Sequence, residues 1–189
     1  SWSASQEGPL GLNDLMQGEC YDARKENICE WHPVTEKQFG YENLVCSNSF
    51  DVVEKENYTG KQIHTPNGEV VIDFGQNIAG YVKFGFYAQA GQCITLYHGE
   101  CLDQNGNFTQ ENFQAPEHRV EQCVKYICKE GWNEYKPEKS IFGFRYIKAI
   151  TDVKVTEKNF TAIAVYSDMP QTGKFECRHP GINQLFSNA

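Results

Sequence analysis

The chain has 189 residues, 13 % of them aromatic, and a formal net charge of -8 at pH 7. This length allows one main domain with a substantial core. No apolar stretch approaches the roughly 18 residues that a membrane-spanning helix needs, so no membrane partner is expected. Because the excess of acidic residues is spread along the chain, a nucleic-acid partner is not expected either.

The eight cysteines show no zinc-ribbon spacing, and several lie in apolar, strand-like runs. Cysteines in such runs behave as small buried hydrophobic residues. The sequence therefore predicts reduced thiols and a cytoplasmic location. Three N-glycosylation sequons, at Asn57, Asn107 and Asn159, leave a secreted glycoprotein as the alternative.

Residues 1–65 contain few regularly spaced apolar residues, which predicts an irregular lead-in that contributes one to three strands. The run VIDFGQNIAGYVKF then follows at Val71–Phe84. Its centre, Gly75–Gly80, contains Gln76 and Asn77 between two glycines. Glycine and asparagine tolerate positive φ, so this segment favours a turn between two strands.

After this segment, Val82, Phe84 and Phe86 alternate with more polar residues, which is the period of a half-buried strand. Further strands are predicted at four runs bounded by turn residues: Cys93–His98, Val124–Cys128, Phe142–Ile150 and Phe160–Ser167. Many short strands joined by hairpin-like turns predict an all-β fold, an antiparallel β-sandwich. Only the end of the chain, from His179, predicts a helix, and it forms a short C-terminal stub.

Four motifs occur in one order: VIDFGQNIAGYVKF, YHGECLDQNGNF, YKPEKSIFGFRYIKA and FECRHPGINQLF. Together they resemble the bacterial α-L-rhamnosidases of glycoside hydrolase family 78. Upstream, GPLGLNDLMQGECYDAR resembles the family's passage from one β-sandwich to the next. The resemblance covers Leu10–Arg24 and Glu69 to the end of the chain. It departs at Phe142, where the family usually has histidine.

The resemblance implies a sandwich of the concanavalin-like or jelly-roll type and assigns hydrolysis to an (α/α)6 barrel that follows it. Residues 1–65 would be a lead-in and the tail of a preceding sandwich, and residues 66–170 the main β-sandwich. Residues 171–189 would be a linker into the barrel, which this chain is expected to lack. The family's catalytic carboxylates then have no counterparts here, so no catalytic residue is expected.

On this basis the chain is expected to scaffold a barrel that removes terminal α-L-rhamnose with inversion. The alternative is a carbohydrate-binding module for rhamnose-type sugars, with calcium assisting. A third hypothesis is an interaction domain, which would present a large apolar patch.

Candidate sugar ligands are the amides of Gln76 and Asn77, which offer hydrogen-bond donors and acceptors, and the nearby Asp73. Asp73 could equally orient the loop. Trp31 and Trp132 are candidate stacking platforms for a sugar ring, although Trp132 could instead cover the end of the sandwich.

Asp103, Asn105 and Asn107 resemble the first half of a calcium loop, but Gly106 comes too early and the twelfth-position Glu is missing. A hairpin loop explains the same residues, and no cofactor other than calcium is suggested. The acidic residues around this loop and the strand-end His98 favour structural roles over catalysis. Arg145, alternating with core aromatics, predicts an ion pair with a carboxylate.

Overall fold

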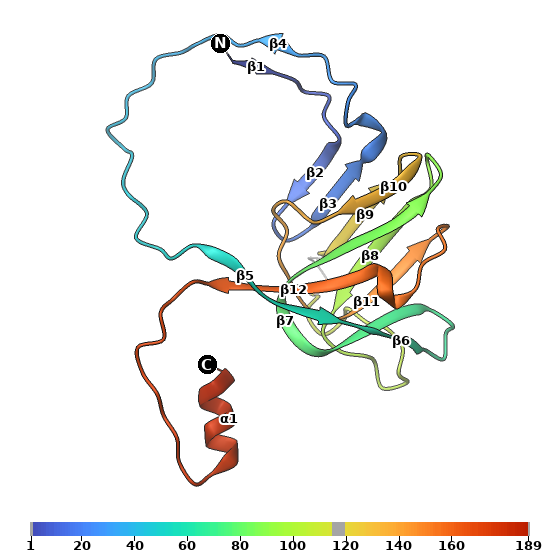
Figure 1. The fold of residues 1–189 in the computed structure, drawn as a ribbon, viewed down its shortest axis with the longest axis vertical. Coiled ribbons are helices and arrows are strands. Elements are labelled where there is room, and N and C mark those ends of the chain that lie inside the picture. Colours follow the sequence, from blue (N-terminus) through green and yellow to red (C-terminus); the bar gives the residue numbers. More distant parts are fainter. Residues whose placement is uncertain (1, 115–119, 189) are drawn as a thin grey trace.

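The computed structural model describes residues 2–114 and 120–188. Twelve strands and one α-helix lie in these residues, as Figure 1 shows. The strands are β1 (Ser3–Ala4), β2 (Leu10–Asp14), β3 (Gly18–Asp22), β4 (His32–Pro33), β5 (Val52–Thr59), β6 (Lys61–His64), β7 (Val70–Ala88), β8 (Cys93–Gly99), β9 (Cys123–Ile127), β10 (Gly131–Tyr135), β11 (Phe142–Thr151) and β12 (Phe160–Ser167). The helix is α1 (Pro180–Asn188), and short 3-10 turns lie at Ala23–Lys25 and Glu157–Asn159.

Ten of the strands form one curled sheet in the order β2-β3-β9-β8-β11-β7-β12-β5, and β6 and β10 also pair with β7. In Figure 1 these strands curl around a common interior rather than lying in a flat layer. The predicted all-β sandwich is confirmed. One detail was wrong, because β3 and β9 pair in parallel while the other pairs are antiparallel. A parallel pair forms between segments distant in the chain and leaves no hairpin signal in the sequence.

Residues 1–65 contribute more strands than predicted. Four of their strands, β2, β3, β5 and β6, belong to the main sheet, and β1 and β4 form a separate two-stranded sheet. The residues of β2, β5 and β6 are mostly exposed, so these strands lack the alternation by which a half-buried strand is recognised.

The core lies on the inner face of the curled sheet and follows the predicted alternation. Val82, Phe84 and Phe86 of β7 are buried, whereas Tyr87 is exposed. Phe84 stacks on Phe86 with ring centroids 5.4 Å apart and meets Tyr126 of β9 edge-on at 5.3 Å. Large aromatic side chains thus join β7 to the strands on the opposite side of the sandwich.

Two peripheral segments extend away from this core. Residues 28–50, which include β4, run as an open arc that leads to β5, and beyond β12 the chain extends to α1, which begins at the predicted place (Figure 1). Neither segment contributes a residue to the buried core. Within the described residues, no helix is both long and apolar enough to cross a membrane. The eight cysteines are all free thiols.

Candidate functional site

The centre of β7 is a bulge, not the predicted turn between two strands. Across from it on β11, Phe144 pairs with Ile78 and Tyr146 pairs with Asp73, so Arg145 alone faces residues 74–77. β6 pairs with β7 up to Asp73, and β12 pairs with it only from Gly80 onward. Residues 74–77 therefore have no cross-strand partner among the described residues. The turn prediction failed because Gly and Asn serve a bulge and a hairpin equally well.

An ion pair fixes the start of the bulge. Arg145 donates from Nε and Nη2 to the two carboxylate oxygens of Asp73, at 2.7 and 2.8 Å. The Arg145 hydrogen bonds hold the pKa of Asp73 below its usual value. Asp73 Oδ1 also accepts the backbone N–H of Gly75 at 2.7 Å, and Gly75 has a φ of 82°. The predicted Arg145 ion pair and the orienting role of Asp73 are both confirmed.

The other end of the bulge meets a carboxylate. Asn77 Nδ2 donates to Glu100 Oε1 at 3.4 Å, and Asn112 Nδ2 donates to Glu100 Oε2 at 2.8 Å. A Cβ at Gly143 would lie 3.1 Å from Glu100 Oε1, so the glycine leaves room for this carboxylate. Glu100 is one of the acidic residues around the Asp103–Asn107 loop for which the sequence favoured a structural role, but this contact with Asn77 and Asn112 was not predicted. No local signal links residues so far apart in the chain.

A wide hollow of about 970 Å³ lies beside the bulge. It is bounded by the bulge, by the paired strands β5 and β12, and by the C-terminal half of α1. Its lining residues are Glu56, Gln76, Asn77, Tyr166, Ser167, Met169, Gln184, Ser187 and Asn188. All of these except Met169 carry an amide, a hydroxyl or a carboxylate. Two of the predicted sugar ligands, Gln76 and Asn77, therefore lie together in the lining of this hollow, beside residues that the sequence did not suggest.

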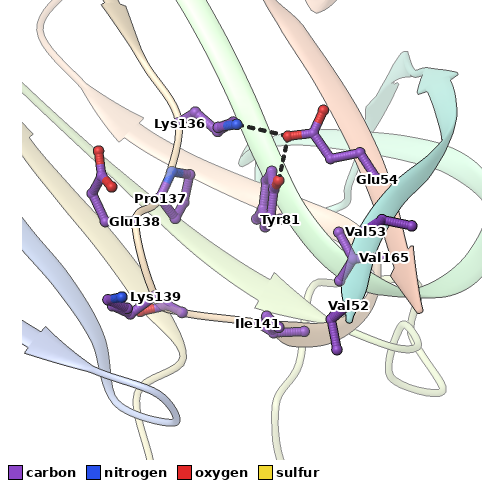
Figure 2. A pocket seen from close by; sticks show the side chains of 11 residues that line it. Val52, Val53, Glu54, Tyr81, Lys136, Pro137, Glu138, Lys139, Ile141 and Val165 are labelled. Carbon is purple, nitrogen blue, oxygen red and sulfur yellow. Dashed lines mark hydrogen bonds and ion pairs between the residues drawn. The ribbon is translucent and has the colours of Figure 1, made fainter. Parts of the chain in front are cut away.

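A second, smaller groove of about 320 Å³ lies where β5 approaches the loop that follows β10 (Figure 2). At its rim, Glu54 Oε1 accepts hydrogen bonds from Tyr81 at 2.6 Å and from Lys136 at 2.7 Å. The Lys136 and Tyr81 hydrogen bonds lower the pKa of Glu54. The strongest polar groups of this groove therefore bind one another.

The Asp103–Asn107 segment is a hairpin loop, as its composition suggested. Leu102 and Phe108 form a bridge across its base. Asp103 Oδ1 accepts the backbone N–H groups of Asn105 and Asn107, at 2.9 and 2.7 Å. The side chain of Asn107 is buried, and its Oδ1 accepts the N–H of Asn67. No group of three or more metal-ligating side chains occurs in the part of the chain that the structure describes.

The two predicted stacking residues lie apart from the bulge. Trp31, in the arc before β5, is 67 % exposed. Trp132 on β10 is half-exposed, and its ring meets that of Tyr87 edge-on at 5.1 Å. Neither tryptophan lines the hollow with Gln76 and Asn77.

His98 is completely buried at the end of β8. Its Nδ1 lies 2.9 Å from the carbonyl oxygen of Gln122, and its ring stacks on Phe142. Burial lowers the pKa of His98 to about 4. The side chain is thus a neutral core residue, as the sequence favoured, and Phe142 is part of the same core.

The family model of the bacterial alpha-L-rhamnosidase concanavalin-like domain matches residues 63–166. An alpha-L-rhamnosidase of Formosa agariphila is 29 % identical in an alignment 200 positions long that covers 98 % of this chain and 21 % of that protein. An alpha-L-rhamnosidase of Streptomyces avermitilis is also 29 % identical, over 99 % of this chain and 19 % of the relative. The chain thus spans about a fifth of the length of the curated relatives that it matches.

Two crystal structures of alpha-L-rhamnosidases resemble this fold closely. The native enzyme from Aspergillus terreus has a TM-score of 0.81 and 29 % identity, over 96 % of this chain and 22 % of that one. The Streptomyces avermitilis enzyme complexed with L-rhamnose has a TM-score of 0.79 and 27 % identity, over 96 % of this chain and 18 % of that one. The similarity therefore covers nearly the whole chain, well beyond the residues that the family model matches.

Proposed function

The chain belongs to the bacterial alpha-L-rhamnosidase concanavalin-like domain family, and on this premise we propose that it is the accessory β-sandwich of a glycoside hydrolase. In this proposal it supports a catalytic barrel in the same polypeptide, which hydrolyses terminal α-L-rhamnose from glycans. The relatives, about five times longer than the chain, support such an intramolecular partner.

The observation that carries the proposal is the apolar surface of the two segments flanking the matched domain. Large apolar side chains occur along the arc before β5, each at least 46 % exposed: Ile28, Trp31, Val34, Phe39, Tyr41, Leu44, Val45 and Phe50. On α1, Ile182, Leu185 and Phe186 are exposed as well. A soluble protein rarely leaves so much apolar surface in water, and such surface commonly marks a protein interface. A neighbouring domain would remove this surface from water.

We keep the proposed division into a lead-in at residues 1–65, a main sandwich at 66–170 and a linker at 171–189. Pairing of β5 and β6 with the main sheet means that the lead-in also completes the sandwich. A cytoplasmic location is part of the proposal and is supported by the eight free thiols.

An aryl α-L-rhamnoside assay on the 189-residue chain and on the full-length gene product tests this division of labour. We expect hydrolysis by the full-length protein alone, because the chain supplies support rather than the reacting groups. Hydrolysis by the 189-residue chain would overturn the accessory role. A full-length protein that leaves every rhamnoside intact would overturn the parent activity.

A further inference from the structure

We propose that the hollow beside the β7 bulge is a saccharide-binding site, with Gln76 and Asn77 as its hydrogen-bonding residues and Tyr166 as its apolar surface. The class of ligand is a neutral sugar. The choice of L-rhamnose as the probe rests on the proposed function, but the site itself is argued from the geometry of the hollow.

The bulge presents polar groups that the sheet does not use. Residues 74–77 have no cross-strand partner in the described residues, although they lie within a strand of 19 residues. Gln76 is exposed, and its amide makes no hydrogen bond to the described part of the chain. Asn77 makes a single long one, at 3.4 Å. Both amides therefore retain donors and acceptors for a ligand.

The backbone that carries these two amides is held in place before a ligand arrives. The Asp73–Arg145 ion pair and the hydrogen bond from Gly75 to Asp73 fix the start of the bulge. At the other end, Glu100 accepts a hydrogen bond from Asn77. Binding would consequently cost less conformational entropy than binding to a loose loop. Bulges are a recognised way to redirect side chains next to binding sites.

The wall opposite the bulge offers complementary chemistry. Glu56 lines the hollow and accepts hydrogen bonds from the hydroxyls of Tyr58 and Tyr166. A carboxylate held in this way has remaining lone pairs for the hydroxyl groups of a sugar. Tyr166 is 49 % exposed and Met169 is more exposed still, so C–H groups of a sugar have an apolar surface to contact.

Size and charge fit a neutral sugar better than a charged ligand. The hollow, about 970 Å³, is at the upper end of the usual range for small-ligand sites, which is enough for more than one sugar ring. Among the described residues its lining contains no Lys or Arg, so it offers no positive charge to an anion. The groove in Figure 2 fits less well, because Glu54, Tyr81 and Lys136 already bind one another there.

NMR titration of the 189-residue chain with L-rhamnose tests the proposal. We expect saturable shifts of the Gln76 and Asn77 amide signals in the millimolar range, since the hollow is open. Gln76→Ala and Asn77→Ala should each weaken binding about fivefold, which is the effect of one hydrogen bond between neutral groups. Gln62→Ala, which removes an exposed amide on β6 outside the hollow, is the matched control and should leave the affinity unchanged.

Two results would overturn the proposal: no shift at saturating sugar, or shifts confined to Trp31 and Trp132. Because the titration uses only this chain, either result leaves the proposed accessory role untouched. Conversely, a full-length protein without rhamnosidase activity would remove the proposed function but not a measured binding site.

Discussion

One ion pair lies at the residue where β7 leaves its pairing with β11. Asp73 is engaged by two nitrogens of Arg145 and by the N–H of Gly75, so the strand leaves the ladder at a defined residue. An arginine can bind both carboxylate oxygens at once, whereas a lysine offers only a point charge. The shape of the bulge therefore depends on arginine at position 145.

Replacing Arg145 with Lys should lower the free energy of unfolding by about 1 kcal/mol, because the two-pronged contact is lost while the partly exposed charge remains. Urea denaturation measures this loss. Arg24→Lys is the matched control: Arg24 also binds one carboxylate through two nitrogens, but Asp22 is only two residues away. An equal loss in both variants would refute a special role for Arg145.

His98 predicts a dependence of stability on pH. Its pKa is about 4 in the folded chain, whereas an unperturbed histidine in the unfolded chain has a pKa of 6.5. Below pH 6.5 the unfolded chain therefore binds a proton that the folded chain does not. Stability should fall as the pH decreases from 6.5 to 4, by up to about 3 kcal/mol from this group. Urea midpoints measured across this range should decrease.

His98→Asn keeps a donor near the Gln122 carbonyl but removes the titrating ring, so its stability should change less between pH 6.5 and 4. The exposed His64→Asn variant should keep the slope of the parent chain. If His98→Asn showed the parent slope, a different group would be responsible for the acid sensitivity.

At the scale of elements, Glu19 joins the N-terminal segment to the main sandwich. It lies on β3, is 1 % exposed, and accepts hydrogen bonds from Tyr135 and from the backbone N–H groups of Glu138, Lys139 and Ser140. Burial raises its pKa, but the hydrogen bonds together lower it below the usual value. One carboxylate thus fixes the loop between β10 and β11.

Glu19→Gln should destabilise the chain by about 2–4 kcal/mol, because an amide nitrogen would then face backbone N–H donors in a buried place. Thermal or urea unfolding measures the change. Glu138→Gln, an exposed neutralisation in the same loop, should stay close to the parent chain. Similar stabilities for the two variants would show that β3 does not depend on this carboxylate.

Sequence reasoning succeeded where apolar residues alternate. The strands from β8 to β12 that bury one face were predicted, apart from β10, whose five residues carry a polar core position at Asn133. The parallel β3–β9 pair and the Glu19 anchor were not predictable, because they join residues more than a hundred positions apart.

At the site, Gln76 and Asn77 were identified from side-chain chemistry alone. Glu56 and Tyr166 were missed because only the curled sheet brings them near the bulge.

At the level of the whole molecule, a sandwich that functioned on its own would not explain the exposed apolar side chains of the arc at residues 28–50. Its apolar side chains do not belong to the core of the sandwich, yet exposing them to water is unfavourable. In the proposed function, another part of the same polypeptide covers these side chains. The bulge and its hollow would then lie on a domain held firmly against its neighbour.

Hydrogen exchange of the full-length gene product, compared with that of the 189-residue chain, measures whether residues 28–50 are covered. We expect backbone amides of residues 28–50 to exchange quickly in the 189-residue chain and to become protected in the full-length protein. The amides of β7 and β11 should be protected in both and serve as the internal control. Equally fast exchange of residues 28–50 in both proteins would refute the proposed accessory role, because nothing would then cover the arc.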